Sequence, residues 1–466
     1  MFDPDIAPSG TLLGLLQRGR GDGTLHALAA PRAEALAALH HCVLRDPRRD
    51  WQVENRSLYY ARLCLDLRAD LGEIEQHLFH PDDLLDTAEE RTGLALSVLG
   101  HLASYGRDDA LLLLRRYAAT GANWAWALDE LALRDDDTAL RALGPAVLAR
   151  FPCTPDGDAE LAAAARGAYE PRPWRLWADD PVHGTRVRAA QERTAFDRWQ
   201  RQLRPSGPRP GWSVHDVLQW AQEEHDARRS DAAARCLTAV AGPEDRPELL
   251  AAAASGPDAA RAAALRHLAE TGDPDVLDLI EAAATGPAPD LVTQAALTAF
   301  ERMRSITALD RARLWAQRPD ALGDAAAAML ACRGGQYDSG LVLAALRRTV
   351  RGEGPDARTL WALVEGAGRL AIGCAAPVLR HIYRETASSH LRGVAAHALA
   401  ATDPSFAAGF AVECLWDCEE STRELAARHA ATADSRVVDQ LRRLAADPVE
   451  EAEVQTAVRS RFAPDA

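Results

Sequence analysis

Apolar residues recur at intervals of three and four positions along most of this 466-residue chain. One such series consists of Val292, Ala295, Ala296, Ala299 and Phe300. The same spacing recurs in 95–102, 124–131, 375–383 and 391–399. Residues at these intervals share one face of an α-helix, whereas strands would show strict alternation, which no segment displays. The pattern predicts an all-α chain.

A longer repeat is superimposed on this helical spacing. In each copy a helical stretch ends at a turn rich in Gly and Asp, and a second helical stretch follows. Four copies are LGHLASYGRDDALLLLRRYAATG (99–121), LRHLAETGDPDVLDLIEAAATG (265–286), AHALAATDPSFAAGFAVECLWD (396–417) and ARHAATADSRVVDQLRRLAAD (427–447). The interval from Asp273 to Asp403 accommodates four units of about 32 residues, which lies in the range of known helical repeats.

The turn residues suit a junction between two helices. Gly272 can adopt the left-handed conformation that ends a helix without a Cβ clash. Asp273 and Asp403 are placed to cap the next helix, because a carboxylate accepts its free N–H groups. Pro274 and Pro404 suit a first helical position, which needs no N–H donor.

A two-helix unit of this length with Asp-Pro before its second helix resembles the HEAT-like repeats of the bacterial bilin-lyase-type class. The resemblance covers roughly 90–150 and 250–450, although most units lack the DxxVR entry of that family. It implies an α-solenoid in which each helix pair buries its apolar stripe against its neighbours. The resemblance implies no particular activity.

We expect three segments: N-terminal helical repeats in 1–151, an irregular connector or insertion in 152–212, and a C-terminal repeat array in 213–466. The middle segment is rich in Pro and Gly and contains one charged helix, predicted over 186–204. It also concentrates Arg, together with Trp174, Trp177, Trp199 and Trp212. The segment is interpreted as a connector between two array halves, as a lid, or as a binding insertion, since Arg and Trp are common at protein interfaces.

The amino-acid composition limits the kinds of partner and the cellular compartment that we expect. The formal net charge is −15, and all 53 basic residues are Arg. An acidic chain lacks the broad basic face that nucleic-acid binding requires. No apolar run approaches the length of a membrane span, and the first ten residues do not resemble a secretory signal. The eight Cys residues form no CxxC pair, which is typical of reduced thiols, so we expect a cytoplasmic protein without cofactors.

The segment EIEQHLFHPDDLLD (73–86) has the highest density of candidate metal ligands. They are Glu73, His77, His80, Asp82, Asp83 and Asp86. Histidine and carboxylate donors so close together suit a divalent metal. The string DDLLD also matches the DDxxD motif with which class I terpene synthases hold magnesium, but the second motif of that family is not recognisable. The alternative interpretation is a helix stop followed by a capped helix start.

Two further groups of residues raise alternatives. In NWAWALDEL (123–131), Trp126 with Asp129 or Glu130 is similar to the Trp and acid that HEAT-like alkylpurine DNA glycosylases use to hold a damaged base. Core packing is the alternative for this helix. Cys414 and Cys418, one helical turn apart, could contribute to a metal site or pack in the core.

The function that these features favour is a non-enzymatic scaffold, adaptor or regulator that binds another protein along the concave surface of the array. Asp273, Asp275, Asp403 and Asp434 are expected to project toward that surface and to attract a basic helix or tail. The competing function is an enzyme on the same scaffold, either metal-assisted at 73–86 or glycosylase-like at 124–130. Fold class cannot decide between them, because function depends on the site.

Overall fold

The computed structural model describes residues 5–50, 53–192, 211–222 and 227–462, and every regular element within these ranges is helical. The all-α prediction is confirmed for this part of the chain. The chain divides into two compact units. The first contains residues 1–203, 384–396 and 404–466, and the second contains 204–383 and 397–403. None of the described helices is both long enough and apolar enough to cross a bilayer.

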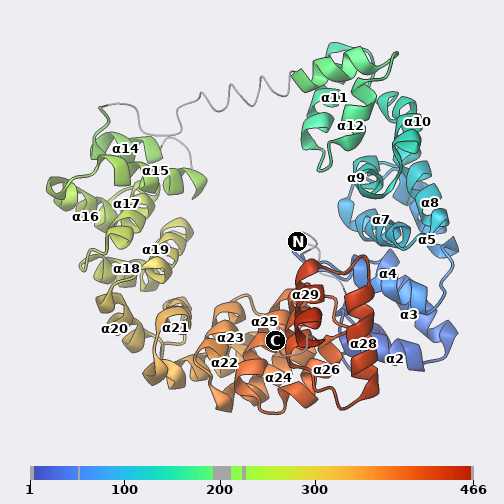
Figure 1. Ribbon diagram of the computed structural model, residues 1–466. Helices are drawn as coiled ribbons and strands as arrows, with labels where there is room; N and C mark the ends of the chain where they lie inside the picture. Colours follow the sequence, from blue (N-terminus) through green and yellow to red (C-terminus); the bar gives the residue numbers. More distant parts are fainter. Residues whose placement is uncertain (1–4, 51–52, 193–210, 223–226, 463–466) are drawn as a thin grey trace. The chain divides into compact units, whose positions relative to one another are not determined.

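The first unit begins with a series of short helices (Figure 1). They are α1 (Leu12–Gln17), α2 (Gly21–Ala29), α3 (Arg32–Leu44), α4 (Ser57–Asp66), α5 (Gly72–Leu78), α6 (Pro81–Leu84), α7 (Glu89–Ser104), α8 (Asp108–Thr120), α9 (Trp124–Arg134), α10 (Asp137–Leu148), α11 (Pro155–Gly167) and α12 (Arg172–Ala178). Residues 184–192 are also helical. The unit resumes near the end of the chain with the 3-10 helix η4 (Phe406–Ala408), α26 (Phe410–Cys414), α27 (Glu420–His429), α28 (Ser435–Ala446) and α29 (Ala452–Phe462).

The second unit consists of helices of 8 to 15 residues and short 3-10 turns. They are α14 (Val214–Ala221), α15 (Ala227–Val240), η1 (Pro243–Asp245), α16 (Arg246–Ser255), α17 (Asp258–Thr271), α18 (Val276–Thr285), α19 (Asp290–Arg302), α20 (Ile306–Trp315), α21 (Ala321–Arg333), η2 (Gln336–Asp338), α22 (Ser339–Glu353), α23 (Leu360–Arg369) and η3 (Gly373–Ala375). Helices α24 (Ala376–Glu385) and α25 (Ser389–Thr402) each carry residues of both units.

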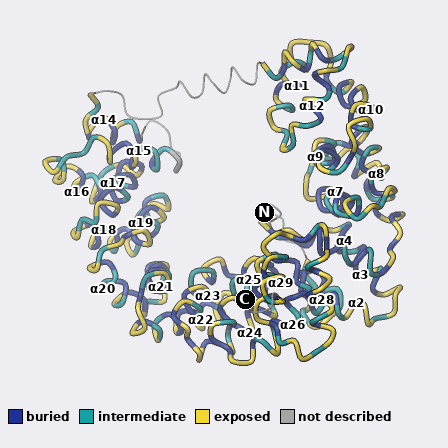
Figure 2. Tube along the Cα trace, viewed as in Figure 1, coloured by how far each residue is buried: buried dark blue, intermediate teal, exposed yellow. Residues whose placement is uncertain are grey.

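Helices of the second unit pack in neighbouring pairs. Helices α15, α17, α19, α21 and α23 form one row in which each contacts the next, and α14, α16, α18, α20 and α22 each pack against a member of that row. Helices α17, α19 and α21 begin at Asp258, Asp290 and Ala321, so successive pairs start 32 and 31 residues apart. This spacing agrees with the repeat length predicted from the sequence. Buried residues line the faces where neighbouring helices meet (Figure 2).

Arginine side chains tie successive helices of the row together. Nη1 of Arg333, the last residue of α21, donates to the carbonyl oxygen of Arg302 at the end of α19, over 3.2 Å. At the end of α23, Nη2 of Arg369 donates to the Ala331 carbonyl oxygen over 2.8 Å. These bonds satisfy carbonyls that have no partner inside their own helix. Arginine therefore sets the register between neighbouring pairs, a role that the sequence alone did not indicate.

The last turn of α23 packs so closely on α21 that only glycine fits at position 366. A Cβ added to Gly366 would lie 2.6 Å from the Cα of Ala331. We expect Gly366→Ala to lower the free energy of unfolding by about 1–3 kcal/mol, because two backbones would have to separate. Urea unfolding followed by circular dichroism measures this change. Gly352→Ala in α22, where no heavy atom lies within 4 Å of the added Cβ, should stabilise the protein by up to about 1 kcal/mol; equal effects of the two variants would contradict the close approach.

The predicted helix stop at Gly272 is confirmed, since this residue ends α17 with a left-handed φ of 75°. The positions expected for the two prolines are wrong. Pro274 lies two residues before the start of α18, and Pro404 lies in a turn before η4. Each helix begins later than predicted because the Asp-Pro pair forms a turn of its own, in which Oδ1 of Asp273 accepts the backbone N–H of Asp275 over 2.9 Å.

The segment 152–212 differs from the irregular connector expected. Its described part contains α11, α12 and the helical residues 184–192. Pro155 and Pro173 lie in the first turn of α11 and of α12, where a missing N–H costs nothing. Trp174 and Trp177 are 2% and 1% exposed and belong to the apolar core of the first unit. Residues 193–210, with Trp199 and most of the predicted charged helix, lie outside the described residues.

The two compact units also differ from the segment expected at 213–466, because the last helices of the chain belong to the same unit as the N-terminal helices. Helix α26 contacts α2, and α28 lies beside α4, where Nη2 of Arg443 is 2.7 Å from Oδ1 of Asp66 (Figure 1). The repeat pattern continues through 404–466 and gave no sign of this change of unit. Tertiary contacts between the two ends of the chain, and not local periodicity, define the first unit.

Candidate functional site

The candidate metal ligands of 73–86 lie on α5, on α6 and in the loop that follows α6. Nδ1 of His77 is 3.1 Å from Oδ2 of Asp83, and Nε2 of the same ring is 2.8 Å from the carbonyl oxygen of Arg91. Asp83 is buried and its carboxylate pairs with the Arg91 guanidinium. The negative charge that a metal cation would need is therefore already neutralised by Arg91. Glu73 is directed elsewhere, with Oε2 3.0 Å from Nδ1 of His40.

The remaining donors of this segment serve the start of α6. Nδ1 of His80 accepts the backbone N–H of Asp82 over 3.3 Å, so His80 caps the start of α6. Asp86 Oδ2 lies 3.4 Å from Nε of Arg91. Across the described residues, no group of three or more His, Cys, Asp or Glu side chains is arranged to hold a metal ion. The structure therefore favours the capped helix start over a metal centre.

The Trp and acid considered for base binding face a neighbouring helix. Nε1 of Trp126 donates to Oγ of Ser97 over 2.9 Å, and Oγ of Ser97 donates to Oε1 of Glu130 over 2.7 Å. Oε2 of Glu130 accepts from Nη1 of Arg134 over 2.6 Å. Trp126 is partly buried against the apolar core. Burial raises the pKa of the Glu130 carboxyl, and Arg134 and the hydrogen bonds oppose that rise.

Two glycines of α7 make room for this chain of hydrogen bonds. A Cβ at Gly93 would lie 2.9 Å from the Trp126 ring, and a Cβ at Gly100 would meet the Glu130 carboxylate. Asp129 accepts the backbone N–H groups of Tyr169 and Glu170, at 3.4 and 3.1 Å. These side chains thus join α9 to α7 and to the segment before α12. This arrangement supports the core-packing interpretation, and Trp124, expected in the buried stripe, is partly buried.

Cys414 and Cys418 do not share a helix as the sequence suggested. Helix α26 ends at Cys414, and Cys418 lies in the loop before α27, because Leu415 and Trp416 form a turn. Both side chains are buried. Burial raises the pKa of the Cys418 thiol to about 12, so it is not a thiolate at neutral pH. Its sulfur lies 3.3 Å from Nη2 of Arg392, a hydrogen-bond contact that fixes the loop.

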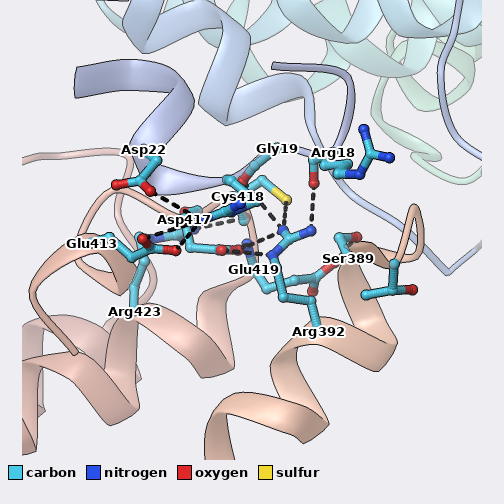
Figure 3. Close-up of polar contacts among 12 residues, drawn as sticks. Arg18, Gly19, Asp22, Ser389, Arg392, Glu413, Asp417, Cys418, Glu419 and Arg423 are labelled. Atoms are coloured by element: carbon cyan, nitrogen blue, oxygen red, sulfur yellow. Dashed lines mark hydrogen bonds and ion pairs between the residues drawn. The ribbon is translucent and has the colours of Figure 1, made fainter. Parts of the chain in front are cut away.

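A buried polar cluster joins the N-terminal and C-terminal parts of the first unit, and we call it the chain-end cluster (Figure 3). Its members are Arg18, Gly19, Arg20, Glu54, Arg56, Ser389, Arg392, Glu413, Asp417, Cys418, Arg423 and Glu450. Arg392 and Asp417 form a two-point ion pair, with both N···O distances 2.9 Å and both side chains fully buried. The Arg392 guanidinium also donates to the carbonyl oxygens of Arg18 and Gly19.

Further bonds of the chain-end cluster connect residues more than 300 positions apart. Nη2 of Arg56 donates to the Ala387 carbonyl oxygen over 2.8 Å. Arg20 Nη2 is 3.0 Å from Oε1 of Glu413, and the backbone N–H of Cys418 donates to the Gly19 carbonyl over 3.0 Å. No sequence pattern could have identified these partners, because their only sequence signal is a charged residue within an apolar stretch. The cluster links the two ends of the first unit.

The acids expected to line a binding surface have partners within the chain. Oδ1 of Asp273 is 2.9 Å from Nη2 of Arg246, which also pairs with Asp275. Asp403 is buried and pairs with Arg380. Asp434 Oδ2 is 2.7 Å from Nη2 of Arg436. Asp273 and Asp403 are thus committed to packing between helices, and the predicted row of free carboxylates is not observed.

His101, at the last turn of α7, makes the stability of the first unit depend on pH. Burial, together with Arg134 and Arg62, lowers the pKa of its imidazole to about 4. Between pH 6.5 and 4 the unfolded chain binds a proton that the folded chain does not, so the free energy of unfolding falls as the pH falls. We expect a loss of about 2 kcal/mol at pH 5 relative to pH 7, which urea unfolding of His101→Gln should lack. His215→Gln, at a solvent-exposed ring, should keep the wild-type pH dependence; a similar loss in His101→Gln would contradict the assignment.

An open cleft of the first unit lies between α1, α3, α5 and the start of α7. It has a volume of about 440 Å³, and its walls include Leu13, His41, Leu44, Arg45, His77 and Glu90. Only His77 was among the residues singled out as metal ligands. The sequence gave the pair His40-His41 no role, and a charged residue at the end of one helix cannot be matched to another helix by periodicity.

No protein-family model matches this chain, and the searches of curated proteins and of solved structures gave no match. The geometry must therefore carry any conclusion about function. In the described residues, the groups predicted to perform chemistry at 73–86, 124–130 and 414–418 are engaged in caps, helix contacts and loop fixation. What is left available to a partner is apolar and charged surface.

Proposed function

We propose that this chain is a non-enzymatic α-solenoid of HEAT-like repeats that binds another protein as a scaffold, adaptor or regulator. Two features of the second unit support the repeat assignment, namely helix pairs that start 32 and 31 residues apart and arginines that tie α21 to α19 and α23 to α21. Arrays of this kind present extended surfaces suited to protein partners. The observation that carries the proposal is an apolar patch on the outside of the second unit.

The patch is formed by Ile306, Leu314 and Tyr337, which are 76%, 71% and 101% exposed. Ile306 and Leu314 are eight positions apart on α20, so they share one face of that helix. Tyr337 is adjacent to Asp338, whose Oδ1 lies 2.8 Å from Nε of Arg313, the neighbour of Leu314. The Arg313–Asp338 ion pair thus ties α20 to η2, the short helix that carries Tyr337. Large apolar side chains with this exposure are a feature of protein interaction sites.

The overall charge favours a basic partner. A net charge of −15 attracts a basic helix or tail over long range and accelerates its encounter at low salt. This attraction arises from the net charge of the whole chain and not from Asp273 or Asp403, because both carboxylates are paired with arginines. In this proposal, charge brings the partner close and the apolar patch holds it.

The test compares partner capture by wild type and two variants from a lysate of the source organism. The patch variant carries Ile306→Ser, Leu314→Ser and Tyr337→Ser, and the control variant carries Leu85→Ser and Leu112→Ser at residues that are 75% and 61% exposed. We expect wild type and control to retain the same protein, the patch variant to lose it, and its amount to fall as salt rises. Identical sets of proteins on all three, or recovery of nucleic acid instead of protein, would refute the proposal.

A further inference from the structure

The cleft of the first unit has rigid polar walls. Gln17 is buried and holds the segment before α1, because its Oε1 accepts the Ala7 N–H over 2.7 Å and its Nε2 donates to the Asp5 carbonyl over 3.0 Å. Asp46 is held by Arg48 through two oxygens, at 2.9 and 3.0 Å from Nε. Both cleft residues are thereby fixed in place. These contacts form the cleft without help from a ligand.

Three charged side chains on the cleft walls, those of Asp5, Arg45 and Glu90, have no ion-pair partner among the described residues. Arg45 follows α3, Glu90 is in the first turn of α7, and both side chains are exposed. Within the described residues, neither the Arg45 guanidinium nor the Glu90 carboxylate has an ion-pair partner. The cleft therefore offers one unpaired positive group, on Arg45, and two unpaired negative groups, on Asp5 and Glu90.

The donors on the α3 side of the cleft are arranged for an anion. The backbone N–H of Arg45 donates to the His41 carbonyl over 3.0 Å, so the two side chains leave α3 one turn apart. Burial and the positive charge of Arg45 lower the pKa of the His41 imidazole, while Asp5 raises it. Burial is the largest cause of the lowered pKa, and on this side of the cleft the negative charge of Asp5 partly offsets the positive charge of Arg45. A carboxylate placed here would find a charge-assisted donor.

Apolar residues complete the cleft. Ala7, Leu13 and Leu44 are partly buried and contribute its apolar walls. A volume of about 440 Å³ falls within the range of small-molecule pockets, which combine apolar walls with a few fixed polar groups. A multiply charged anion such as a nucleotide suits the cleft poorly, because Glu90 would repel it. A ligand with one negative charge, one positive charge and an apolar body could pair with Arg45, pair with Glu90 and pack against the apolar walls, respectively.

We propose that this cleft is a binding site for an apolar α-amino acid. The ligand carboxylate pairs with Arg45 and the His41 side, its ammonium group pairs with Glu90, and its side chain packs against Leu13 and Leu44. The proposal is independent of the protein-binding function, since the cleft belongs to the first unit and the apolar patch to the second. It assigns no covalent chemistry to the site.

The test is calorimetric titration of the full chain with the apolar amino acids, with L-leucine as the reference probe. We expect at least one to bind with a dissociation constant of about 1 mM or below. For L-leucine, 4-methylpentanoate lacks the ammonium group and 3-methylbutylamine lacks the carboxylate, so both should bind at least about tenfold more weakly. Absence of binding by every apolar amino acid at about 10 mM would overturn the proposal.

Two variants test whether Arg45 binds the ligand carboxylate and whether Glu90 binds the ligand ammonium group. Arg45→Gln should weaken binding of the amino acid and of 4-methylpentanoate by about tenfold or more, whereas Glu90→Gln should weaken binding of the amino acid alone. Glu89→Gln, at the neighbouring exposed acid outside the cleft walls, is the matched control and should bind as wild type does. Equal affinity of wild type, Arg45→Gln and Glu90→Gln would refute this site, and binding of 4-methylpentanoate as tight as that of the amino acid would refute the zwitterionic ligand.

Discussion

Replacement of Arg392 by methionine is expected to lower the free energy of unfolding by about 3–5 kcal/mol, because it would leave the Asp417 carboxylate buried without its counter-charge. The same change removes the donors to the Arg18 and Gly19 carbonyls, which connect α25 to the turn after α1. Urea unfolding measures the loss as a lower midpoint. Hydrogen exchange read by peptide should show faster exchange in 14–20 and 414–419 and unchanged exchange in the second unit.

Two companion variants separate charge burial from simple loss of a side chain. Arg351→Met makes the same substitution at an exposed position of α22 and should change stability by no more than about 0.5 kcal/mol. The double variant Arg392→Met/Asp417→Leu removes both buried charges and should recover most of the loss, since a buried ion pair is often replaceable by apolar residues. A loss below about 1 kcal/mol in Arg392→Met would show that the pair contributes little to holding the chain ends together.

Local features of the fold were predictable because their causes are local in sequence. The stripe of Val292, Ala296 and Phe300 is fully buried, as its spacing indicated, because residues at i, i+4 and i+8 must share one face of α19. The stop at Gly272 followed from a single backbone preference. Helix type, apolar faces and one class of turn could therefore be read from residues within about two turns of each other.

The features that sequence reasoning missed depend on partners far along the chain. Arg20 and Glu413 are 393 positions apart, and nothing near either residue indicates that they form an ion pair. The acids Asp273 and Asp403 were predicted to be free because periodicity places them at helix starts but does not show which arginine a neighbouring helix brings to them. The same limit applies to the cleft, whose free charges Arg45 and Glu90 come from different helices.

The candidate chemistry at 73–86 illustrates why ligand density alone misleads. Each donor there is close to the next in sequence, but Asp83 contacts both His77 and Arg91, whereas Glu73 contacts His40. A metal requires donors that converge on one point, a property that depends on side-chain direction and not on spacing. The competing capped-helix interpretation needed only local hydrogen bonds, which is why it agrees with the structure.

Replacement of Trp177 by alanine is expected to lower the free energy of unfolding by about 3–5 kcal/mol, since the large buried side chain would leave a cavity. The ring packs edge to face on Trp174 at 5.1 Å between centroids, its Nε1 donates to the Leu140 carbonyl over 2.8 Å, and Gly144 leaves room for it on α10. These contacts make α12 part of the first unit's core. An insertion or lid would tolerate the change.

Two variants make this test specific to core packing. Trp177→Phe keeps an aromatic ring but loses the bond to the Leu140 carbonyl, so its loss should be smaller than that of Trp177→Ala. Tyr169→Ala, at a residue of the same segment that is 81% exposed, should change stability by no more than about 0.5 kcal/mol. The midpoint of urea unfolding compares all three with wild type. If the Trp177→Ala protein were as stable as the Tyr169→Ala protein, α12 would not contribute to the core of the first unit. A helix that packs in a core loses stability when its largest buried side chain is removed.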